Sequence, residues 1–218
     1  MTTADLFDTT PDKDAAPIAL AEGAVLLPGF VGSAENLLLA AIEQVLQEAP
    51  LRHMTTPGGY IMSVAMSNCG DLGWVSDRRG YRYDAIDPDG GLPWPNMPEV
   101  FQTLASEAAQ ASGYSNFAPD ACLINCYEPG ARLSLHQDKN ERDPHAPIVS
   151  VSLGLPAIFL FGSTQRNERP TRYRLQHGDV VVWGGAARYN FHGVAALADG
   201  WHSKLGRKRI NLTFRKAA

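Results

Sequence analysis

The sequence predicts a mainly β protein, an antiparallel sandwich or barrel with helices packed outside it. From Asp120 onward, short apolar strands are separated by turns rich in Gly, Pro and polar residues. Two helical stretches precede them, and many short strands at this spacing favour an antiparallel sandwich or barrel over a parallel sheet. With 218 residues, 44% of them hydrophobic and 19% charged, the chain has the size and composition of one globular domain.

The start of the chain predicts neither export nor a membrane anchor. Residues 1–16 are polar and acidic, so we expect a flexible tail ahead of a single domain, 17–218. No basic segment precedes an apolar stretch, and no apolar run approaches the roughly 20 residues that span a bilayer. The three cysteines, Cys69, Cys122 and Cys126, are odd in number and lack metal-ligand spacing, which indicates reduced thiols. We therefore expect a cytoplasmic protein without membrane association.

The net charge of −4 is unevenly distributed. Residues 1–50 carry eight acidic side chains and one basic one, whereas the remainder carries 15 acidic and 18 basic ones. The remainder can present a basic face to nucleic acid, but a mildly positive surface is also typical of proteins that bind none. Charge alone identifies no partner.

Two amphipathic helices are predicted before the strands. Ser33 is a candidate N-cap for a helix that ends near Ala49, and a second helix follows Pro98 and stops at Gly113. Each has an apolar stripe that we expect to lie on a sheet. The stripes are Leu37, Leu38, Ala41, Ile42, Val45 and Leu46 in the first helix and Val100, Phe101, Leu104, Ala105 and Ala108 in the second.

Residues 51–95 have a different character from the rest of the chain. Turn signals break the segments TPGGYIMSVAMSNCGDLGW and YRYDAIDPDGGLPWP into short aromatic-rich strands, which predicts a hairpin-rich flap. The β core is expected over 117–216. Its predicted strands are ACLINCY, RLSLHQD, IVSVSLGL, IFLFG, TRYRLQ, DVVVWG and RINLTFR.

The chemistry is expected at a His-x-Asp motif, which places an imidazole and a carboxylate on one face of a strand. The sequence has two such motifs, His136-Gln-Asp138 and His177-Gly-Asp179. The second lies where a hairpin turn is predicted between two strands, so we interpret it as turn structure. The first lies where an alternating strand ends in polar residues, as expected at the mouth of a barrel.

His192, 56 residues after His136, is the candidate third metal ligand. Two histidines and one carboxylate on one side of Fe(II) leave three adjacent positions for oxygen and substrate. On its position alone, an ordinary half-buried histidine is the better interpretation of His192.

The last predicted strand, RINLTFR, alternates strictly and places Arg209, Asn211, Thr213 and Arg215 on one face. If that face points inward, the two guanidinium groups need anionic partners, and a dicarboxylate ligand would satisfy both. The alternative is an edge strand whose arginines face water, and alternation does not decide between the two.

These motifs together resemble the AlkB family of Fe(II)/2-oxoglutarate dioxygenases, which repair alkylated nucleic acids. The resemblance includes an Asn-x-Tyr strand, the first His-x-Asp motif, the later histidine and the strand with two arginines. It extends over nearly everything after residue 20, through TPGGYIMSVAMSNCGDLGW, SLHQDK, APIVSVSLGLPAIF, HGDVVVWGG and NLTFR. It implies a double-stranded β-helix, a jelly-roll core with an N-terminal helical buttress and a nucleotide-recognition flap.

The resemblance also implies the cofactors and their ligands. Fe(II) would be held by His136, Asp138 and His192, and the co-substrates would be 2-oxoglutarate and O₂. Arg209 would bind one carboxylate of 2-oxoglutarate and Arg215 the other. Hydrogen bonds to this co-substrate are expected from Asn125, Tyr127 and Asn211.

The implied reaction is oxidative demethylation of bases of the 1-methyladenine and 3-methylcytosine type in DNA, with RNA left open. It would release formaldehyde, succinate and CO₂ and restore the base by direct reversal. Nucleic acid, as a single strand or with a flipped base, is the expected partner, and no obligate protein partner is expected. The alternatives are a hydroxylase of proteins or small molecules and a non-catalytic jelly-roll binding module.

The resemblance assigns substrate contacts mainly to the flap. A base must leave the stack to be reached, and Trp74 is expected to stack on it opposite His136. The other expected contacts are Met66, Tyr81, Tyr83, Asn140 and Arg166. For Met66 and Tyr83, plain flap packing is the simpler interpretation from the residues alone.

One of these positions departs from the family pattern. Asn140 stands where the family sequence HQDKDE has an acidic residue, which leaves the reaction class unchanged and the lesion preference open. The basic segment from Lys204 to Arg209 is either a phosphate contact or a solvated loop.

Overall fold

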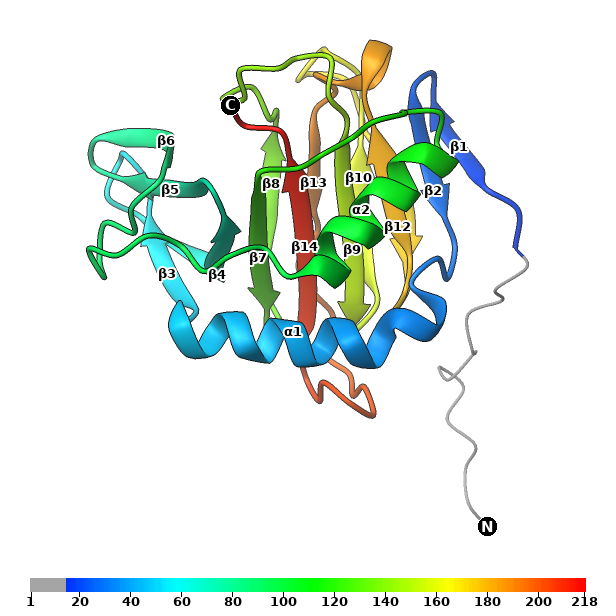
Figure 1. Ribbon diagram of the computed structural model, residues 1–218. Coiled ribbons are helices and arrows are strands. Elements are labelled where there is room, and N and C mark those ends of the chain that lie inside the picture. The colour runs from blue at the N-terminus through cyan, green and yellow to red at the C-terminus, as the bar shows by residue number, and fades with distance from the viewer. Residues whose placement is uncertain (1–14) are drawn as a thin grey trace.

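The computed structural model describes residues 15–218 as two facing antiparallel sheets with two helices on one side (Figure 1). Nearly all of the predicted tail, 1–16, therefore lies outside the described residues. The predicted β sandwich with outer helices is confirmed. In the described part of the chain, no helix is long and apolar enough to cross a membrane.

The large sheet has eight strands, and β14 lies near its middle between β9 and β7. Its strands in spatial order are β1 (Ile18–Ala21), β2 (Ala24–Leu27), β12 (Val180–Trp183), β9 (Ile148–Gly154), β14 (Arg209–Arg215), β7 (Ala121–Tyr127), β4 (Ile61–Gly70) and β3 (Arg52–Thr55). The small sheet has four strands, β11 (Thr171–Leu175), β10 (Ala157–Phe161), β13 (His192–Val194) and β8 (Leu133–His136). A separate hairpin is formed by β5 (Gly73–Asp77) and β6 (Gly80–Asp84).

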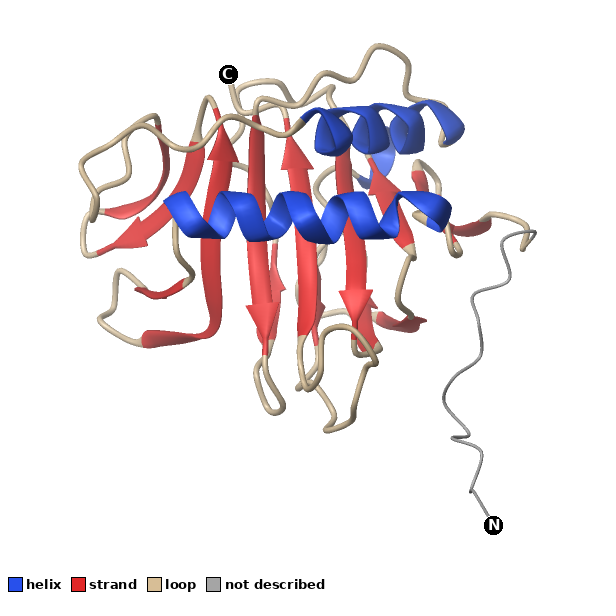
Figure 2. Ribbon diagram, turned by 60° about the horizontal axis from the view of Figure 1, so that its bottom comes forward, coloured by secondary structure: helices blue, strands red, loops and turns tan. Residues whose placement is uncertain are grey.

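Two apolar clusters hold these layers together. The outer cluster lies between the large sheet and the helices α1 (Glu35–Glu48) and α2 (Glu99–Ala111), which cross one face of that sheet (Figure 2). In it, Phe101 of α2 meets Phe214 of β14 edge to face, with ring centroids 5.8 Å apart. The inner cluster fills the space between the sheets, and its members include Phe159 and Trp183.

The helices differ from the prediction at two positions. Ser33 does not cap α1, because it lies in a 3-10 turn over Gly32–Ala34 whose bonds are made by the backbone. Leu37 is 65% exposed, since the buried face of α1 is formed by Leu38, Ala41, Ile42 and Val45. The predicted stop of α2 is confirmed: Gly113 follows the helix with a φ of +89°.

The N-terminal half contributes more to the sandwich than predicted. β1 and β2 form a hairpin at one edge of the large sheet, and its signal was the apolar runs IALA and AVLL on either side of Glu22-Gly23. Within the predicted flap, β3 and β4 pair into the other edge of the large sheet, where β4 joins β7. Only β5 and β6 stand apart as the predicted hairpin.

Candidate active site

Three metal-ligating side chains meet at one end of the small sheet. Pairing of β13 with β8 places His192 opposite His136, and their ring centroids are 4.4 Å apart. Asp138 follows β8, with its Oδ1 3.8 Å from His136 Nε2 and its Oδ2 3.7 Å from His192 Nε2. One ligand atom from each of the three residues lies within 4.8 Å of the others, close enough to hold one ion.

The backbone orients both imidazoles toward this point. His136 Nδ1 lies 2.8 Å from the carbonyl oxygen of Ser134, and His192 Nδ1 lies 3.0 Å from that of Asn190. A carbonyl oxygen can only accept, so each Nδ1 carries the proton and each Nε2 keeps a free lone pair. Two imidazoles and one carboxylate with free positions are the donor set of non-haem Fe(II) sites.

Burial and neighbouring charges set the protonation of two of these ligands. Burial lowers the pKa of His192 to about 3, helped by the adjacent His136, so His192 is neutral as a metal ligand must be. Burial acts against ionisation of Asp138, but the Arg215 guanidinium outweighs it and holds the pKa of Asp138 below its ordinary value. Asp138 therefore supplies an anion.

Two buried guanidinium groups extend from β14 into the same space. Arg215 donates from Nε and Nη2 to Asp138 Oδ2 at 2.9 and 2.7 Å, which leaves its buried Nη1 without a partner among the described atoms. Arg209 donates from Nη2 to Ser152 Oγ at 3.1 Å and lies over the Tyr127 ring at 5.0 Å. Its Nε and Nη1 find no partner in the described structure, although Arg209 is only 1% exposed.

These unpaired N–H groups fit an anionic ligand. A buried guanidinium without a carboxylate or phosphate is costly, and its fork matches a carboxylate in a bidentate manner. The inward face of β14 and its partner β7 also presents amides, with Asn125 Nδ2 donating to Asn211 Oδ1 at 3.3 Å. Asn125 Oδ1 is buried and unpaired among the described residues, so it offers a further polar contact.

A cavity of about 510 Å³ joins the metal ligands, the arginines and the flap. That volume suits a small-molecule site. Every predicted metal, co-substrate and substrate residue except Tyr83 lines it: Met66, Trp74, Tyr81, Asn125, Tyr127, His136, Asp138, Asn140, Arg166, His192, Arg209, Asn211 and Arg215. Trp74 and Tyr81, on adjacent strands of the hairpin, stack with ring centroids 5.6 Å apart and an interplanar angle of 15°.

Comparisons with known proteins agree with this geometry. The family model described as 2OG-Fe(II) oxygenase superfamily matches residues 23–215. The alpha-ketoglutarate-dependent dioxygenases AlkB of Escherichia coli (strain K12) and Salmonella typhimurium (strain LT2) are 54% and 55% identical to the chain. These matches cover 97% and 98% of this chain and 98% of each relative. The solved structure of OsALKBH1 superimposes with a TM-score of 0.79 at 30% identity, over 92% of this chain and all of that one.

The chain is a 2-oxoglutarate- and Fe(II)-dependent dioxygenase of the AlkB family. The predicted class of enzyme and its cofactors, Fe(II), 2-oxoglutarate and O₂, are thereby confirmed. The jelly-roll fold that the resemblance implied is confirmed as well.

Tyr83 does not line the dioxygenase cavity. Its hydroxyl donates to Glu141 Oε1 at 2.6 Å, and burial, the largest cause, raises the pKa of Tyr83. In the hairpin, Tyr83 is the cross-strand partner of Trp74, so it lies beside a predicted substrate contact without lining the cavity itself. Its hydrogen bond to Glu141 links β6 of the flap to the segment after Asp138.

Two residues that were not among the predicted site residues, Glu141 and Arg188, fix the segment after Asp138 in place. Glu141 is almost fully buried and receives Arg188 Nη2 at 3.0 Å in addition to Tyr83. Arg188, 2% exposed, also donates to the backbone oxygens of Asp138 at 2.7 Å and Ala146 at 3.2 Å. Glu141 could have been noticed, because it ends the HQDKNE segment that contains the predicted metal ligands His136 and Asp138. Arg188 lies in a turn-like stretch, and nothing in the sequence indicates that its side chain is buried.

The second His-x-Asp motif is turn structure, as predicted, but the predicted hairpin is wrong, because the turn connects β11 of the small sheet to β12 of the large sheet. Asp179 Oδ1 accepts from the backbone N–H of Gly29 at 2.9 Å, and its Oδ2 accepts from that of Gln176 at 2.7 Å. Gly178 makes the turn with a φ of +88°. His177 is directed to Glu35 of α1, with 3.1 Å between Nε2 and Oε1, so the motif converges on no ion.

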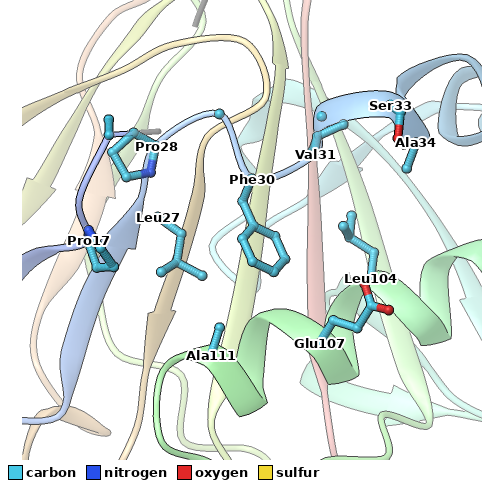
Figure 3. A pocket seen from close by; sticks show the side chains of 13 residues that line it. Pro17, Leu27, Pro28, Phe30, Val31, Ser33, Ala34, Leu104, Glu107 and Ala111 are labelled. Carbon is cyan, nitrogen blue, oxygen red and sulfur yellow. The ribbon is translucent and has the colours of Figure 1, made fainter. Parts of the chain in front are cut away.

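A second hollow of similar volume, about 510 Å³, lies on the helical side of the dioxygenase (Figure 3). It is lined by mostly apolar side chains between α2 and the segment after β2, including Leu27, Phe30, Val31 and Leu104. Glu107 is the one charged side chain among the described lining residues. This hollow lacks the metal-ligating side chains that mark the first cavity.

Proposed function

We propose that this dioxygenase demethylates nucleic-acid bases of the 1-methyladenine and 3-methylcytosine type, in DNA and also in RNA, as direct-reversal repair. The observation that carries the proposal is one cavity shared by the metal ligands, the unpaired arginines and a stacked aromatic pair on a separate hairpin. Relatives bear names of the same kind, tRNA demethylase abh1 of Schizosaccharomyces pombe and Nucleic acid dioxygenase ALKBH1 of Homo sapiens. We also propose a cytoplasmic location, supported by three free cysteines, and no obligate protein partner.

The geometry of the inner face supports the following roles. His136, Asp138 and His192 would hold Fe(II) through their converging ligand atoms. Arg209 would bind one carboxylate of 2-oxoglutarate with its unpaired Nε and Nη1, and Arg215 would reach the other with Nη1 while keeping Asp138 in place. The hydrogen bonds around the co-substrate would come from Asn125, Tyr127 and Asn211.

When bound, Fe(II) supplies activation of O₂ at the expense of 2-oxoglutarate, giving succinate, CO₂ and a hydroxylated alkyl group that leaves as formaldehyde. The chain's own contribution is to position the alkylated base and to exclude water. Trp74 and Tyr81 offer flat faces at the cavity, and stacking contributes about 1–3 kcal/mol per base. A cationic methylated base would gain further from an aromatic face. Met66, Asn140 and Arg166 complete the proposed substrate contacts, and Tyr83, which does not line the cavity, would support Trp74 from the adjacent strand.

The test is turnover of an oligonucleotide carrying 1-methyladenine with Fe(II), 2-oxoglutarate and O₂. We expect formaldehyde and succinate in equal amounts, with the unmethylated oligonucleotide as control. Succinate formation without a stimulation by the methylated oligonucleotide would contradict the proposal and would favour a protein or a small molecule as the substrate. A methylated peptide library, assayed in the same way, would then identify that class.

A further inference from the structure

A row of unpaired arginines leads away from the cavity. The segment 165–174 contains four arginines and one acidic residue, in a chain whose net charge is −4. The four arginines are Arg166, Arg169, Arg172 and Arg174. All four are exposed, and none lies within ion-pair distance of a described carboxylate. Exposed cations without partners are free to meet phosphate groups.

The strand register directs two of these arginines outward. β11 is an edge strand, and its partner β10 places Phe159 opposite Tyr173, Leu160 opposite Arg172 and Ile158 opposite Arg174. Phe159 is buried between the sheets and Tyr173 packs against the same cluster. Since side chains alternate along a strand, Arg172 and Arg174 lie on the outer face, about 7 Å apart.

The same register connects the row to the cavity. Phe161 of β10 pairs with both Thr171, the first residue of β11, and His192, so the row begins level with the metal ligands. Arg166 lines the cavity, with its guanidinium 5.7 Å from the centre of the Phe191 ring. A chain leaving the cavity past Arg166 would meet Arg172 and then Arg174 within about 10 Å of strand.

The other basic segment of the chain offers no such surface. Lys204 pairs with Glu35 at 2.8 Å, Arg207 pairs with Asp199 at 2.7 Å, and Arg209 is buried in the cavity. This segment precedes β14 and lies about 20 Å from the Arg215 end of that strand. The loop is at the bottom of Figure 1, at the opposite end of β14 from the C-terminus.

We propose that Arg169, Arg172 and Arg174 bind the phosphates of the single-stranded segment that flanks the base in the cavity. The nucleic-acid surface then extends from Arg166 along the outer face of the small sheet, on the side remote from α1 and α2. The inference rests on the proposed function, because the cavity must hold a base for the flanking strand to follow this path. Each phosphate contact on a single strand contributes about −0.7 to the slope of log affinity against log salt.

The test compares two charge-matched double variants, R172Q/R174Q and, as control, R207Q/K208Q. The dissociation constant is measured anaerobically, with Fe(II) and 2-oxoglutarate present, by fluorescence anisotropy. The probe is a single-stranded oligonucleotide of about 15 nucleotides with a central 1-methyladenine, at salt concentrations from about 0.05 to 0.3 M. A trinucleotide with the same lesion serves as the short probe.

For R172Q/R174Q we expect a salt slope shallower by about 1.4 and binding about 20-fold weaker at 0.1 M salt, with a smaller loss on the trinucleotide. The control should keep the wild-type slope. An unchanged salt slope in R172Q/R174Q, or the same change in both variants, would overturn the inference. The arginines would then serve only to keep the exposed edge strand β11 from pairing with another chain. A wild-type enzyme that binds and demethylates neither probe would overturn the proposed function itself.

Discussion

The carboxylate of Asp138 is both a proposed metal ligand and the ion-pair partner of Arg215. Its Oδ1 faces His136, while its Oδ2 accepts both N–H groups of Arg215 and lies near His192. A metal ion on this carboxylate would share it with a fixed cation, and if the side chain rotated away, Arg215 would lose both short hydrogen bonds and keep only Glu141 Oε1, 3.5 Å from its Nε. The ligand is therefore held in place by electrostatics as well as by packing.

Replacing Asp138 by Ala removes the anionic ligand and the hydrogen-bonded carboxylate of Arg215 together. We expect the affinity for Fe(II), measured by anaerobic metal titration, to fall by more than about 100-fold, with loss of turnover. The matched control is Asp179→Ala, which removes a carboxylate that bonds only backbone N–H groups of Gly29 and Gln176. It should cost about 1–3 kcal/mol of stability and leave Fe(II) affinity unchanged. If the two variants behaved the other way round, the choice of ligands would be wrong.

Asn140 lies at the cavity as a neutral amide where the family pattern has a carboxylate. 1-Methyladenine and 3-methylcytosine are cations, whereas 3-methylthymine is neutral. A carboxylate favours the cations by about 1 kcal/mol over what an amide provides, which corresponds to several-fold in rate. We expect Asn140→Asp to raise the kcat/KM ratio of 3-methylcytosine over 3-methylthymine several-fold in single-stranded oligonucleotides. Equal ratios in the two enzymes would show that this position does not sense the charge of the base.

At the scale of elements, β8 carries the metal ligand on an irregular strand. His136 pairs with His192, and Leu133 pairs with Val194. The two pairs are three residues apart along β8 but only two residues apart along β13, so β8 contains a bulge. Strict alternation would place Leu133 and His136 on opposite faces of the strand. The bulge turns both inward, and Leu133 packs against the inner cluster while His136 lines the cavity.

The elements that the sequence predicted well are those with one buried face and a clear period. β14 is the best example, since Ile210, Leu212 and Phe214 lie in the outer cluster while the residues between them face the cavity. Prediction failed where contacts between distant segments decide the structure. The burial of Arg188 depends on a segment about 50 residues away, and the exposure of Leu37 depends on how α1 is rotated on the sheet.

A charged cluster ties three separate elements together, and it predicts how stability depends on pH. Glu35 of α1 pairs with His177 of the β11–β12 turn and with Lys204 of the loop before β14, and His202 stacks on His177 at 4.4 Å. Burial, followed by the charge of His202, lowers the pKa of His177 despite Glu35. Below about pH 6.5 the unfolded chain therefore binds more protons than the folded one at this position, and stability falls with falling pH.

Replacing His177 by Gln should flatten that dependence. We expect the loss in free energy of unfolding between pH 7 and about pH 5 to be smaller in His177→Gln than in the parent, measured by urea unfolding at each pH. His145→Gln, at an exposed position, is the control and should follow the parent. A steeper loss in His177→Gln than in the parent would mean that the protonated imidazole stabilises the fold through Glu35.

At the scale of the whole molecule, the co-substrate site is built at a cost to the fold. Arg209 is 1% exposed and two of its nitrogens have no partner among the described residues, and burial lowers its pKa. Such a group destabilises the empty protein by about 1–3 kcal/mol until an anion reaches it. At a concentration 100 times its dissociation constant, 2-oxoglutarate would stabilise the folded state by about 2.7 kcal/mol.

Arg209→Met should therefore be more stable than the parent when no 2-oxoglutarate is present. We expect its midpoint of thermal unfolding, measured anaerobically with Fe(II), to exceed that of the parent and to respond little to 2-oxoglutarate. Lys208→Met, at the exposed neighbouring position, should retain the response of the parent. A lower midpoint for Arg209→Met in the absence of 2-oxoglutarate would show that Ser152 and Tyr127 already satisfy the guanidinium.

The two faces of β14 also determine which positions of this enzyme tolerate substitution. One face of the strand belongs to the helix-covered cluster and the other to the co-substrate cavity, so nearly every substitution along it threatens either folding or turnover. The hairpin of β5 and β6 and the outer face of β11 hold neither the metal ligands nor the arginines of the co-substrate site. Substitutions in those two places should therefore change substrate preference while the iron chemistry stays intact.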